Sequence, residues 1–301
     1  MSNLLHSNIE NIESKGERVT IAEKIKQQFD QFTPAERELV NALIANYPMA
    51  GLVTITELAK SANVSTPTVM RTAKKLGFKG FSDFQAALRD ELQQTLSDPM
   101  VKHDHWASDV PAEHILGQFA TAVTTNLRQS LKQIDHESFD QVVSLLSEKN
   151  RGVHIVGGRI THAFADYLQT HLQVIRKNVQ MLPSSSGLWP HHLLNINSGD
   201  VLIIFDIRRY EADLLELAKL ASERDVKIVL FTDQWLSPIT SHATHYFTSR
   251  IEAPSGWDSG VVILFIIESL IAALEKALWS DTSSRLKELE DIFNFTGRFK
   301  R

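Results

Sequence analysis

The feature that most constrains the fold is a set of uninterrupted apolar runs in the C-terminal half of the chain. Val201–Phe205 (VLIIF) and Lys227–Thr232 (KIVLFT) show no alternation of polar and apolar residues, and the helical pattern of Leu214–Ala221 separates them. An earlier run, Val153–Val156, ends in two glycines. Strands that are apolar on both faces and alternate with helices are typical of parallel sheets covered by helices on both sides. The sequence therefore predicts a parallel α/β domain.

The N-terminal part of the chain has a different sequence pattern, because every element predicted from Ile21 to Leu96 is a helix. Thr33 and Glu36 have the spacing of a capping box, with a proline at the first helical position. Thr54 and Glu57 repeat this spacing. Further helix starts are expected at Ser65 and at Ser82 with Gln85, and Gly77 is expected to end a helix.

Residues Ile55–Leu76 predict a helix-turn-helix. A capped helix, Thr56–Ala62, is followed by a tight turn at Asn63-Val64 and by a second capped helix that starts at Ser65. Five basic residues and no acidic residue lie between Lys60 and Gly80, although the whole chain has a formal net charge of −5. Local positive charge is what the neutralisation of DNA phosphates requires. A helical bundle with a solvated basic face is the alternative.

In this motif the second helix enters the major groove with its N-terminal residues against the base edges. Thr66, Thr68 and Arg71 are therefore expected to face bases, and an arginine can bind guanine through two hydrogen bonds. The lysines that follow suit phosphate contacts, which fix position without reading sequence. The predicted DNA-binding residues are Ser65, Thr66, Thr68, Arg71, Lys74, Lys75 and Lys79.

Four stretches of this region make a distinctive combination. They are Phe32–Arg37 (FTPAER), Ile55–Ala59 (ITELA), Val64–Arg71 (VSTPTVMR) and Lys75–Phe81 (KLGFKGF). The combination resembles the N-terminal domain of the RpiR/MurR family of bacterial transcription regulators. The resemblance implies an all-α helix-turn-helix domain followed by a SIS (sugar isomerase) domain, which has a flavodoxin-like parallel sheet flanked by helices. It agrees with the α/β domain that the apolar runs predict.

SIS domains usually hold a sugar phosphate with two loops that follow strands. The first usually reads Gly-x-Gly-x-Ser and directs backbone N–H groups and a helix N-terminus at the phosphate. Here the matching residues are Gly157–Thr161 (GGRIT), and Arg159 takes the place of the second glycine. The second loop usually reads Ser-x-Ser-Gly-x-Thr, and here it reads Asp206–Glu211 (DIRRYE). The resemblance therefore does not carry the sugar-phosphate ligand over to this chain.

Arg208 and Arg209 have two competing interpretations. They can clamp a small anion, because a guanidinium forks onto a carboxylate or a phosphate, or they can pair with Asp206 and Glu211 and close the pocket. Serines after the predicted second strand are expected to face the same crevice, and Glu252 is a weaker candidate. The predicted effector-binding residues are Gly157, Gly158, Arg159, Thr161, Ser184, Ser185, Asp206, Arg208, Arg209 and Glu252.

The length of 301 residues favours two domains. Residues 19–96 are expected to form the DNA-binding domain and residues 112–280 the SIS-like domain. A linker is expected over residues 97–111, which contain two prolines and no apolar periodicity. Residues 1–18 are expected to be a flexible N-terminus, and residues 281–301 a C-terminal amphipathic helix or tail.

These observations predict a DNA-binding transcriptional regulator whose SIS-like domain senses a small anionic metabolite. We expect it to bind double-stranded operator DNA as a homodimer or homotetramer, because each helix-turn-helix reads one half-site. Two alternatives stay open. One is a sugar-phosphate isomerase that uses Asp206, Glu211, Glu252 or His162 as acid–base groups, and the other is an oligomerisation module without a ligand.

The sequence predicts neither a cofactor nor a metal site. It has no cysteine, which excludes disulfides and thiolate sites. The histidine pairs His103/His105 and His191/His192 have metal-ligand spacing but lack a third ligand. The first residues are polar, unlike a signal peptide, and the longest apolar run, Val261–Ile267, is too short to span a bilayer. A cytoplasmic protein without a membrane partner is therefore expected.

Overall fold

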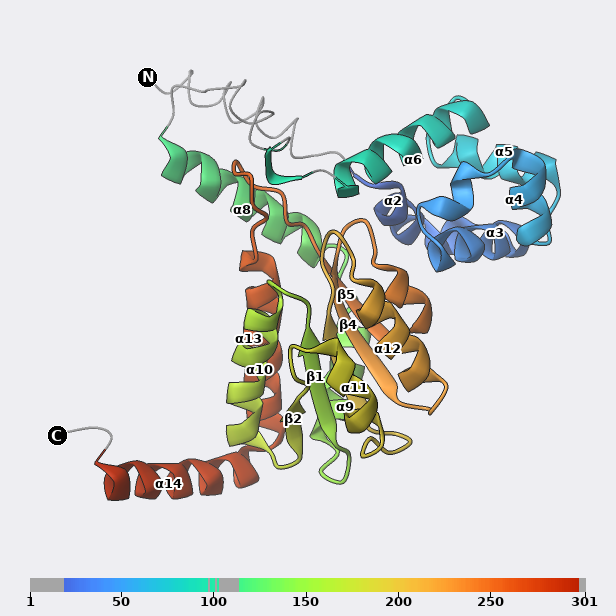
Figure 1. Ribbon diagram of the computed structural model, residues 1–301. Coiled ribbons are helices and arrows are strands. Elements are labelled where there is room, and N and C mark those ends of the chain that lie inside the picture. Colours follow the sequence, from blue (N-terminus) through green and yellow to red (C-terminus); the bar gives the residue numbers. More distant parts are fainter. Residues whose placement is uncertain (1–18, 97, 101, 103–113, 298–301) are drawn as a thin grey trace.

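The computed structural model describes residues 19–96, 98–100, 102 and 114–297, and its N-terminal part is a small helical domain (Figure 1). The segment predicted to be a flexible N-terminus and most of the predicted linker, including His103 and His105, lie outside the described residues. The helices of the domain are α2 (Ile21–Gln27), α3 (Pro34–Ala45), α4 (Ile55–Ser61), α5 (Thr66–Lys75) and α6 (Phe81–Leu96), with short 3-10 turns η1 (Phe29–Gln31) and η2 (Met49–Leu52).

Local capping chemistry sets most of these helix boundaries. The capping boxes predicted before α3 and α4, with Thr33 and Thr54 as caps, are both confirmed. The hydroxyl of Ser65 accepts a hydrogen bond from the backbone N–H of Thr68, which confirms the predicted start of α5. The box predicted at Ser82 is wrong, because α6 begins at Phe81, so Ser82 lies inside the helix, and Gln85 donates instead to the carbonyls of Gly51 and Val53.

The C-terminal part is a parallel five-stranded sheet with the strand order β2-β1-β3-β4-β5. All four neighbouring pairs are parallel. The strands are β1 (Val153–Gly157), β2 (Val179–Met181), β3 (Val201–Phe205), β4 (Lys227–Asp233) and β5 (His245–Ser249). Every residue of β1 and β3 is buried, as the uninterrupted apolar runs predict.

Helices cover both faces of the sheet. On one face α9 (His136–Ser147), α10 (His162–Ile175) and α13 (Val261–Ala277) share a core with alternate strand residues such as Ile203 and Phe205. On the other face α11 (Trp189–Leu193), which follows η3 (Ser186–Leu188), packs with α12 (Ala212–Ser222) and η4 (Pro238–His242) on Leu202 and Ile204. The side chains of one buried strand therefore supply two separate cores.

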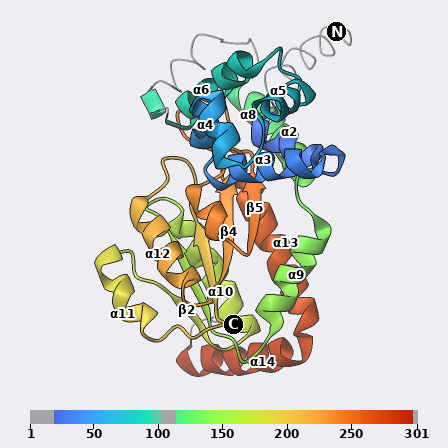
Figure 2. The same cartoon turned by 90° about the vertical axis from the view of Figure 1, so that its right-hand side faces the viewer.

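The helical domain lies over the carboxyl ends of β4 and β5, and the last helix leaves from the opposite end of the sheet (Figures 1 and 2). The guanidinium of Arg250, just after β5, binds the carboxylate of Glu23 in α2 at 2.5 and 2.8 Å, and both side chains are 6% exposed. Leu236, after β4, is buried in the core of the helical domain. A buried ion pair and an apolar contact thus join the two domains.

Two further helices complete the described chain. Helix α8 (Ile115–Leu131) contacts α13 and β5, and α14 (Trp279–Thr296) contacts the C-terminal end of α10, where the hydroxyl of Thr282 donates to the carbonyl of Ile175. No helix in the described residues is both long and apolar enough to span a membrane.

Candidate DNA-binding surface and effector crevice

The turn between α4 and α5 has the geometry that a helix-turn-helix requires. Asn63 adopts a left-handed backbone conformation with a φ of 51°. The N–H of Val64 donates to the carbonyl of Ala59 at 2.9 Å, so the chain reverses within three residues. Ala59 and Leu58 are buried where the two helices meet, and Val69 and Leu76 of α5 complete this contact.

Helix α5 presents a basic, solvent-exposed side. Arg71 and Lys74 on this helix are exposed, as are the capping residue Ser65 and Lys79 in the segment between α5 and α6, and Thr66 is half-buried. The guanidinium of Arg71 donates to the hydroxyl of Thr68 at 3.2 Å, one turn earlier, which directs it toward the N-terminal end of the helix. That end is the part of a recognition helix that reaches base edges.

Thr68 and Lys75, two of the predicted DNA-binding residues, make contacts within the protein that the sequence did not predict. Thr68 is 5% exposed, and its hydroxyl bonds Ser65 and Arg71, so it positions Arg71 and does not face solvent. The ammonium of Lys75 binds the carboxylate of Glu36 at 2.9 Å and the carbonyl of Gln31 at 2.6 Å. Lys75 therefore ties α5 to α3, although its side chain stays 31% exposed.

A crevice is expected where the sheet changes direction. The chain leaves β1 toward β2 on one side and β3 toward β4 on the other, so the loops after β1 and β3 diverge at their carboxyl ends. Gly157 closes the first loop tightly, because a Cβ there would lie 2.6 Å from the carbonyl oxygen of Thr161. The loop then continues directly into α10, since the N–H of His162 donates to the carbonyl of Gly158 at 2.8 Å.

A carboxylate of the chain itself lies on this first loop. The Oε1 atom of Glu211 accepts a hydrogen bond from the backbone N–H of Arg159 at 2.8 Å. A Cβ on Gly158 would lie 2.4 Å from the same oxygen, so the glycine makes room for the carboxylate. Arg159 itself is exposed. The two loops are therefore brought together as predicted, by Glu211 and a backbone N–H.

Asp206 points into the protein. It is 3% exposed, and its carboxylate accepts hydrogen bonds from the hydroxyl of Ser237 and from the N–H of Glu211 at 3.3 Å. The pKa of Asp206 is raised to about 7, chiefly by burial and further by the charges of Asp233 and Glu211, while the two hydrogen bonds act in the opposite direction. Asp206 is thus a buried support of the loop and does not face a ligand.

The contacts of Arg208 also differ from both interpretations of the sequence, an anion clamp and a pair with Asp206 or Glu211. Its Nε donates to the carboxylate of Asp258 at 2.7 Å, its Nη1 donates to the carbonyl of Gln94 at the end of α6, and its guanidinium lies 4.4 Å from the ring centroid of Trp235. The side chain is 8% exposed. Neither Asp206 nor Glu211 is its partner, so Arg208 joins the β3–α12 loop to the DNA-binding domain.

The backbone of this loop is anchored to the end of β4. The carboxylate of Asp233 accepts hydrogen bonds from the N–H of Arg208 at 2.6 Å, the hydroxyl of Tyr210 at 2.8 Å and the N–H of Trp235 at 2.9 Å. Burial raises the pKa of Asp233, and burial together with Asp233 raises that of Tyr210. Arg209 is exposed, and both arginines have positive φ values, 37° for Arg208 and 52° for Arg209.

Of the remaining predicted effector residues, only Thr161 belongs to the two loops of this crevice. The hydroxyl of Thr161 donates to the carbonyl of Phe205 at 2.8 Å, which joins the first loop to β3. Ser184 and Ser185 are exposed after β2, one strand away. Glu252 is exposed after β5, and its carbonyl accepts from the side chain of Asn126 at 2.6 Å. These residues belong to three different places.

The sequence did not reveal Gln94, Trp235, Ser237 and Asp258 as members of this network. Asp258 and Gln94 follow no motif, and only the fold brings them to Arg208. Ser237 had a usable signal, because it comes soon after a predicted strand whose carboxyl end faces the crevice.

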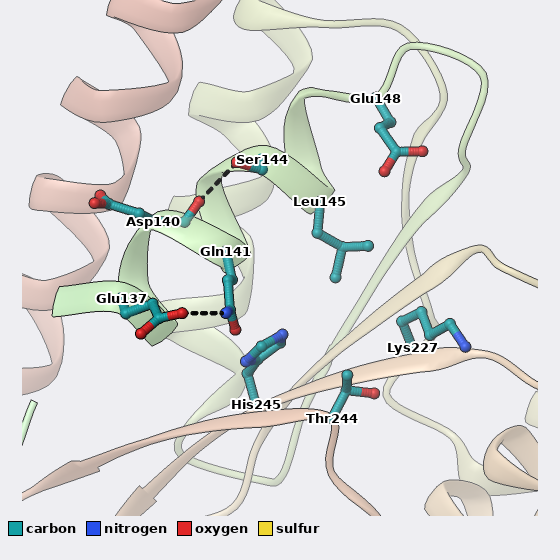
Figure 3. Close-up of a pocket in the computed structure, with 9 residues that line it drawn as sticks. All are labelled: Glu137, Asp140, Gln141, Ser144, Leu145, Glu148, Lys227, Thr244 and His245. Carbon is teal, nitrogen blue, oxygen red and sulfur yellow. Dashed lines mark hydrogen bonds between the residues drawn. The ribbon is translucent and has the colours of Figure 1, made fainter. Parts of the chain in front are cut away.

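A cavity of about 640 Å³ lies elsewhere, between α9 and the first residues of β4 and β5 (Figure 3). Its lining residues are Glu137, Asp140, Gln141, Ser144, Leu145, Glu148, Lys227, Thr244 and His245. Among these residues Lys227 is paired with Asp225 at 2.6 Å, and burial lowers the pKa of His245. The charge of the cavity lining therefore comes mainly from its carboxylates. In the parts of the chain that the structure describes, no group of three metal-ligating side chains is present, at His191 and His192 or elsewhere.

Comparison with known proteins assigns both domains. The model of the helix-turn-helix domain of the rpiR family matches residues 19–95, and the model of the SIS domain matches residues 145–273. The HTH-type transcriptional regulator HexR of Escherichia coli is 25% identical over 280 residues, which are 90% of this chain and 94% of HexR.

Two solved structures share the fold. The sugar isomerase domain of an RpiR transcription factor from Sphaerobacter thermophilus aligns with a TM-score of 0.56 at 22% identity, covering 60% of this chain and 99% of that one. The NanR protein of Vibrio vulnificus, solved in complex with ManNAc-6P, aligns with a TM-score of 0.53 at 21% identity, covering 91% of this chain and 98% of NanR. This chain belongs to the rpiR family of helix-turn-helix proteins, in the form that carries a C-terminal SIS domain.

Proposed function

We propose that the protein is a transcriptional regulator that binds operator DNA through α5 and responds to a small molecule bound by its SIS domain. The observation that carries the proposal is the exposed basic side of α5, held in a capped helix-turn-helix that matches the rpiR model. The likeness to HexR over 90% of the chain supports the same activity. In this proposal Arg71 reads bases, and Lys74 and Lys79 contact phosphates.

The proposed effector is a small anionic metabolite that binds in the crevice between the β1 and β3 loops. The N–H of Arg159 already holds a carboxylate oxygen there, which supports the affinity of this loop for anions. The exposed guanidinium groups of Arg159 and Arg209 add positive charge around it. NanR, with a similar fold, binds the phosphorylated sugar ManNAc-6P, so an anionic carbohydrate derivative is one candidate class.

A homodimer or homotetramer is the proposed assembly. One chain carries one helix-turn-helix, and proteins with this motif read paired half-sites. Apolar side chains that a monomer leaves in water are concentrated on α13 and α14, namely Val261, Phe265, Trp279, Leu286, Ile292 and Phe295. A protein that acts on operator DNA is proposed to work in the bacterial cytoplasm.

The isomerase alternative is weaker on the geometry of its candidate groups. Asp206 is buried and bonds Ser237, so this carboxylate is not free to move a substrate proton. A basic helix-turn-helix also has no use in an isomerase. Turnover of common aldose or ketose phosphates by the purified protein would favour the enzyme after all.

The test of DNA recognition uses Arg71→Ala and binding curves measured by fluorescence anisotropy on a selected operator and on random duplex DNA. We expect affinity for the operator to fall by about 1–3 kcal/mol, because a bidentate base contact is lost. Affinity for random DNA should fall much less, since it depends on phosphate contacts. Arg89→Ala, which removes the same charge from an exposed position on α6, is the matched control. Equal losses on both DNAs would show that Arg71 does not read bases.

A further inference from the structure

The carboxylate of Glu211 occupies the position that an anionic ligand of the first loop would take. Its Oε1 atom lies 2.8 Å from the N–H of Arg159. This loop leads directly into α10, whose N-terminal end carries partial positive charge. Backbone N–H groups at such an end are ready-made partners of anions. Here the anion is supplied by the chain itself.

The fit around this carboxylate is close. A Cβ added to Gly158 would lie 2.4 Å from Oε1 and 2.9 Å from the carboxyl carbon of Glu211. The backbone N–H of Glu211 donates in turn to Asp206, which fixes the start of α12 behind the carboxylate. An incoming anion therefore cannot use the N–H of Arg159 while Glu211 remains there.

Glu211 ends the stretch Asp206–Glu211, which aligns with the Ser-x-Ser-Gly-x-Thr loop of SIS domains. A threonine at this position would present a short neutral hydroxyl, whereas glutamate reaches across the crevice with a negative charge. The exposed Asp213 lies two residues later on the same helix and has no such contact with the first loop. What distinguishes Glu211 from Asp213 is therefore its contact with the first loop and not its negative charge alone.

We propose that Glu211 is a tethered competitor of the effector's anionic group and determines which anions the crevice accepts and at what concentration. This inference rests on the proposed function, in which an anion binds in this crevice. The apparent affinity of a ligand falls in proportion to the fraction of protein that is competent to bind it. An effector must displace Glu211 through contacts of its own, so a bare anion binds poorly to the parent protein.

The experiment measures the binding of inorganic phosphate to the full chain by isothermal titration calorimetry near neutral pH. We expect Glu211→Gln to bind phosphate more tightly than the parent, because the competing charge is gone. We expect Glu211→Thr to bind phosphate about tenfold more tightly than the parent, or tighter still, because both the negative charge and the length of the side chain are removed. Asp213→Asn, which removes the same charge from the same helix, should bind phosphate like the parent. Thermal unfolding without phosphate establishes that each variant is folded.

Operator binding of the same preparations separates this inference from the proposed function. Equal phosphate affinity in the parent and Glu211→Thr, or no phosphate binding in either folded protein, overturns the role of Glu211 even if the operator is bound. An equal gain in Asp213→Asn also overturns it, because general charge would then explain the effect. Failure of the parent to bind any operator contradicts the proposed function, whatever the phosphate titration gives.

Discussion

Lys74 and Lys75 are sequence neighbours on α5, but their surroundings give them different tasks. Both residues are exposed, but only the ammonium of Lys75 is bound to Glu36 and to the carbonyl of Gln31. The sequence predicted the basic stretch but could not separate the two, because the partners of Lys75 lie 39 and 44 residues away. Charge patterns identify a basic surface, and tertiary contacts decide which cations remain available.

We therefore expect different effects from Lys74→Ala and Lys75→Ala. Lys74→Ala should weaken binding to all DNA sequences and lower the slope of log affinity against log salt by about 1, as the loss of one phosphate contact predicts. Lys75→Ala should lower the thermal stability of the helical domain and leave the salt slope nearly unchanged. Anisotropy titrations at several salt concentrations, with thermal unfolding, measure both. A reduced salt slope in Lys75→Ala would contradict this assignment.

Asp206 should make stability depend on pH. Its pKa is raised from 3.8 to about 7, so the folded protein keeps a proton that the unfolded chain releases. The stabilising contribution of this carboxyl is complete below about pH 4 and is lost as the pH rises through about 7. We expect Asp206→Asn to reduce the fall in unfolding temperature between these pH values. Part of the fall should remain in this variant, because burial also raises the pKa of Glu91 to about 7.

Calorimetric scans of the parent and of Asp206→Asn at several pH values measure this difference. Asp213→Asn, at an exposed position on α12, serves as the control and should follow the parent. Identical pH profiles for the parent and Asp206→Asn would mean that Asp206 is ionised in the folded protein at neutral pH.

Among the elements, the capped helices α3 to α5 and the strands β1, β3 and β4 followed from the sequence, and the β3–α12 loop did not. Caps such as Thr33 and Thr54 bond the backbone three residues later, so a local pattern predicts them. A strand that is buried on both faces, such as β3, is predicted by an uninterrupted apolar run. The partners of the loop come from 31, 50 and 114 residues away, at Ser237, Asp258 and Gln94. No local pattern encodes such contacts. Topology predicts where the crevice lies, and that stays a prediction, whereas the contacts of Asp206 and Arg208 could not be read from the sequence.

The loop offers a test of backbone strain at Arg209. A φ of 52° is a left-handed conformation that costs an L-residue about 1–2 kcal/mol, and glycine avoids that cost. We expect Arg209→Gly to raise the free energy of unfolding by up to about 1 kcal/mol, after the greater flexibility of glycine in the unfolded chain is offset. Arg209→Ala keeps a Cβ and should give no such gain. Thermal unfolding compares the two, and equal stability would show that the conformation is unstrained.

In the whole molecule, contacts between the domains place the recognition helix relative to the crevice. The pair of Arg250 and Glu23 is buried between α2 and the end of β5. The contacts of Arg208 with Asp258 and Gln94 lie at another part of the same interface. A ligand that moves the β3–α12 loop therefore acts on a group that touches α6 directly. The interface provides a physical route from the crevice to the DNA-binding domain.

We expect Arg250→Met to destabilise the protein by about 3 kcal/mol or more, because it leaves the carboxylate of Glu23 buried without its cation. The double variant Arg250→Met with Glu23→Gln should lose less, since the orphaned charge is also removed. Lys149→Met, which breaks the exposed pair with Asp281, should cost under about 1 kcal/mol. Thermal unfolding and small-angle scattering measure stability and domain separation. A double variant as unstable as the single one would contradict the ion-pair explanation.

The left-handed backbone at Arg209 also bears on how this protein can change over evolutionary time. Arg209 aligns with the glycine of the Ser-x-Ser-Gly-x-Thr loop, and the loop still follows the path that a glycine would take there. The loop has the same number of residues as the usual one between β3 and α12. A few point substitutions, without any rebuilding of the main chain, therefore separate this charged loop from one lined by hydroxyl groups. Ligand preference in such a scaffold can diverge while the operator-reading domain stays as it is.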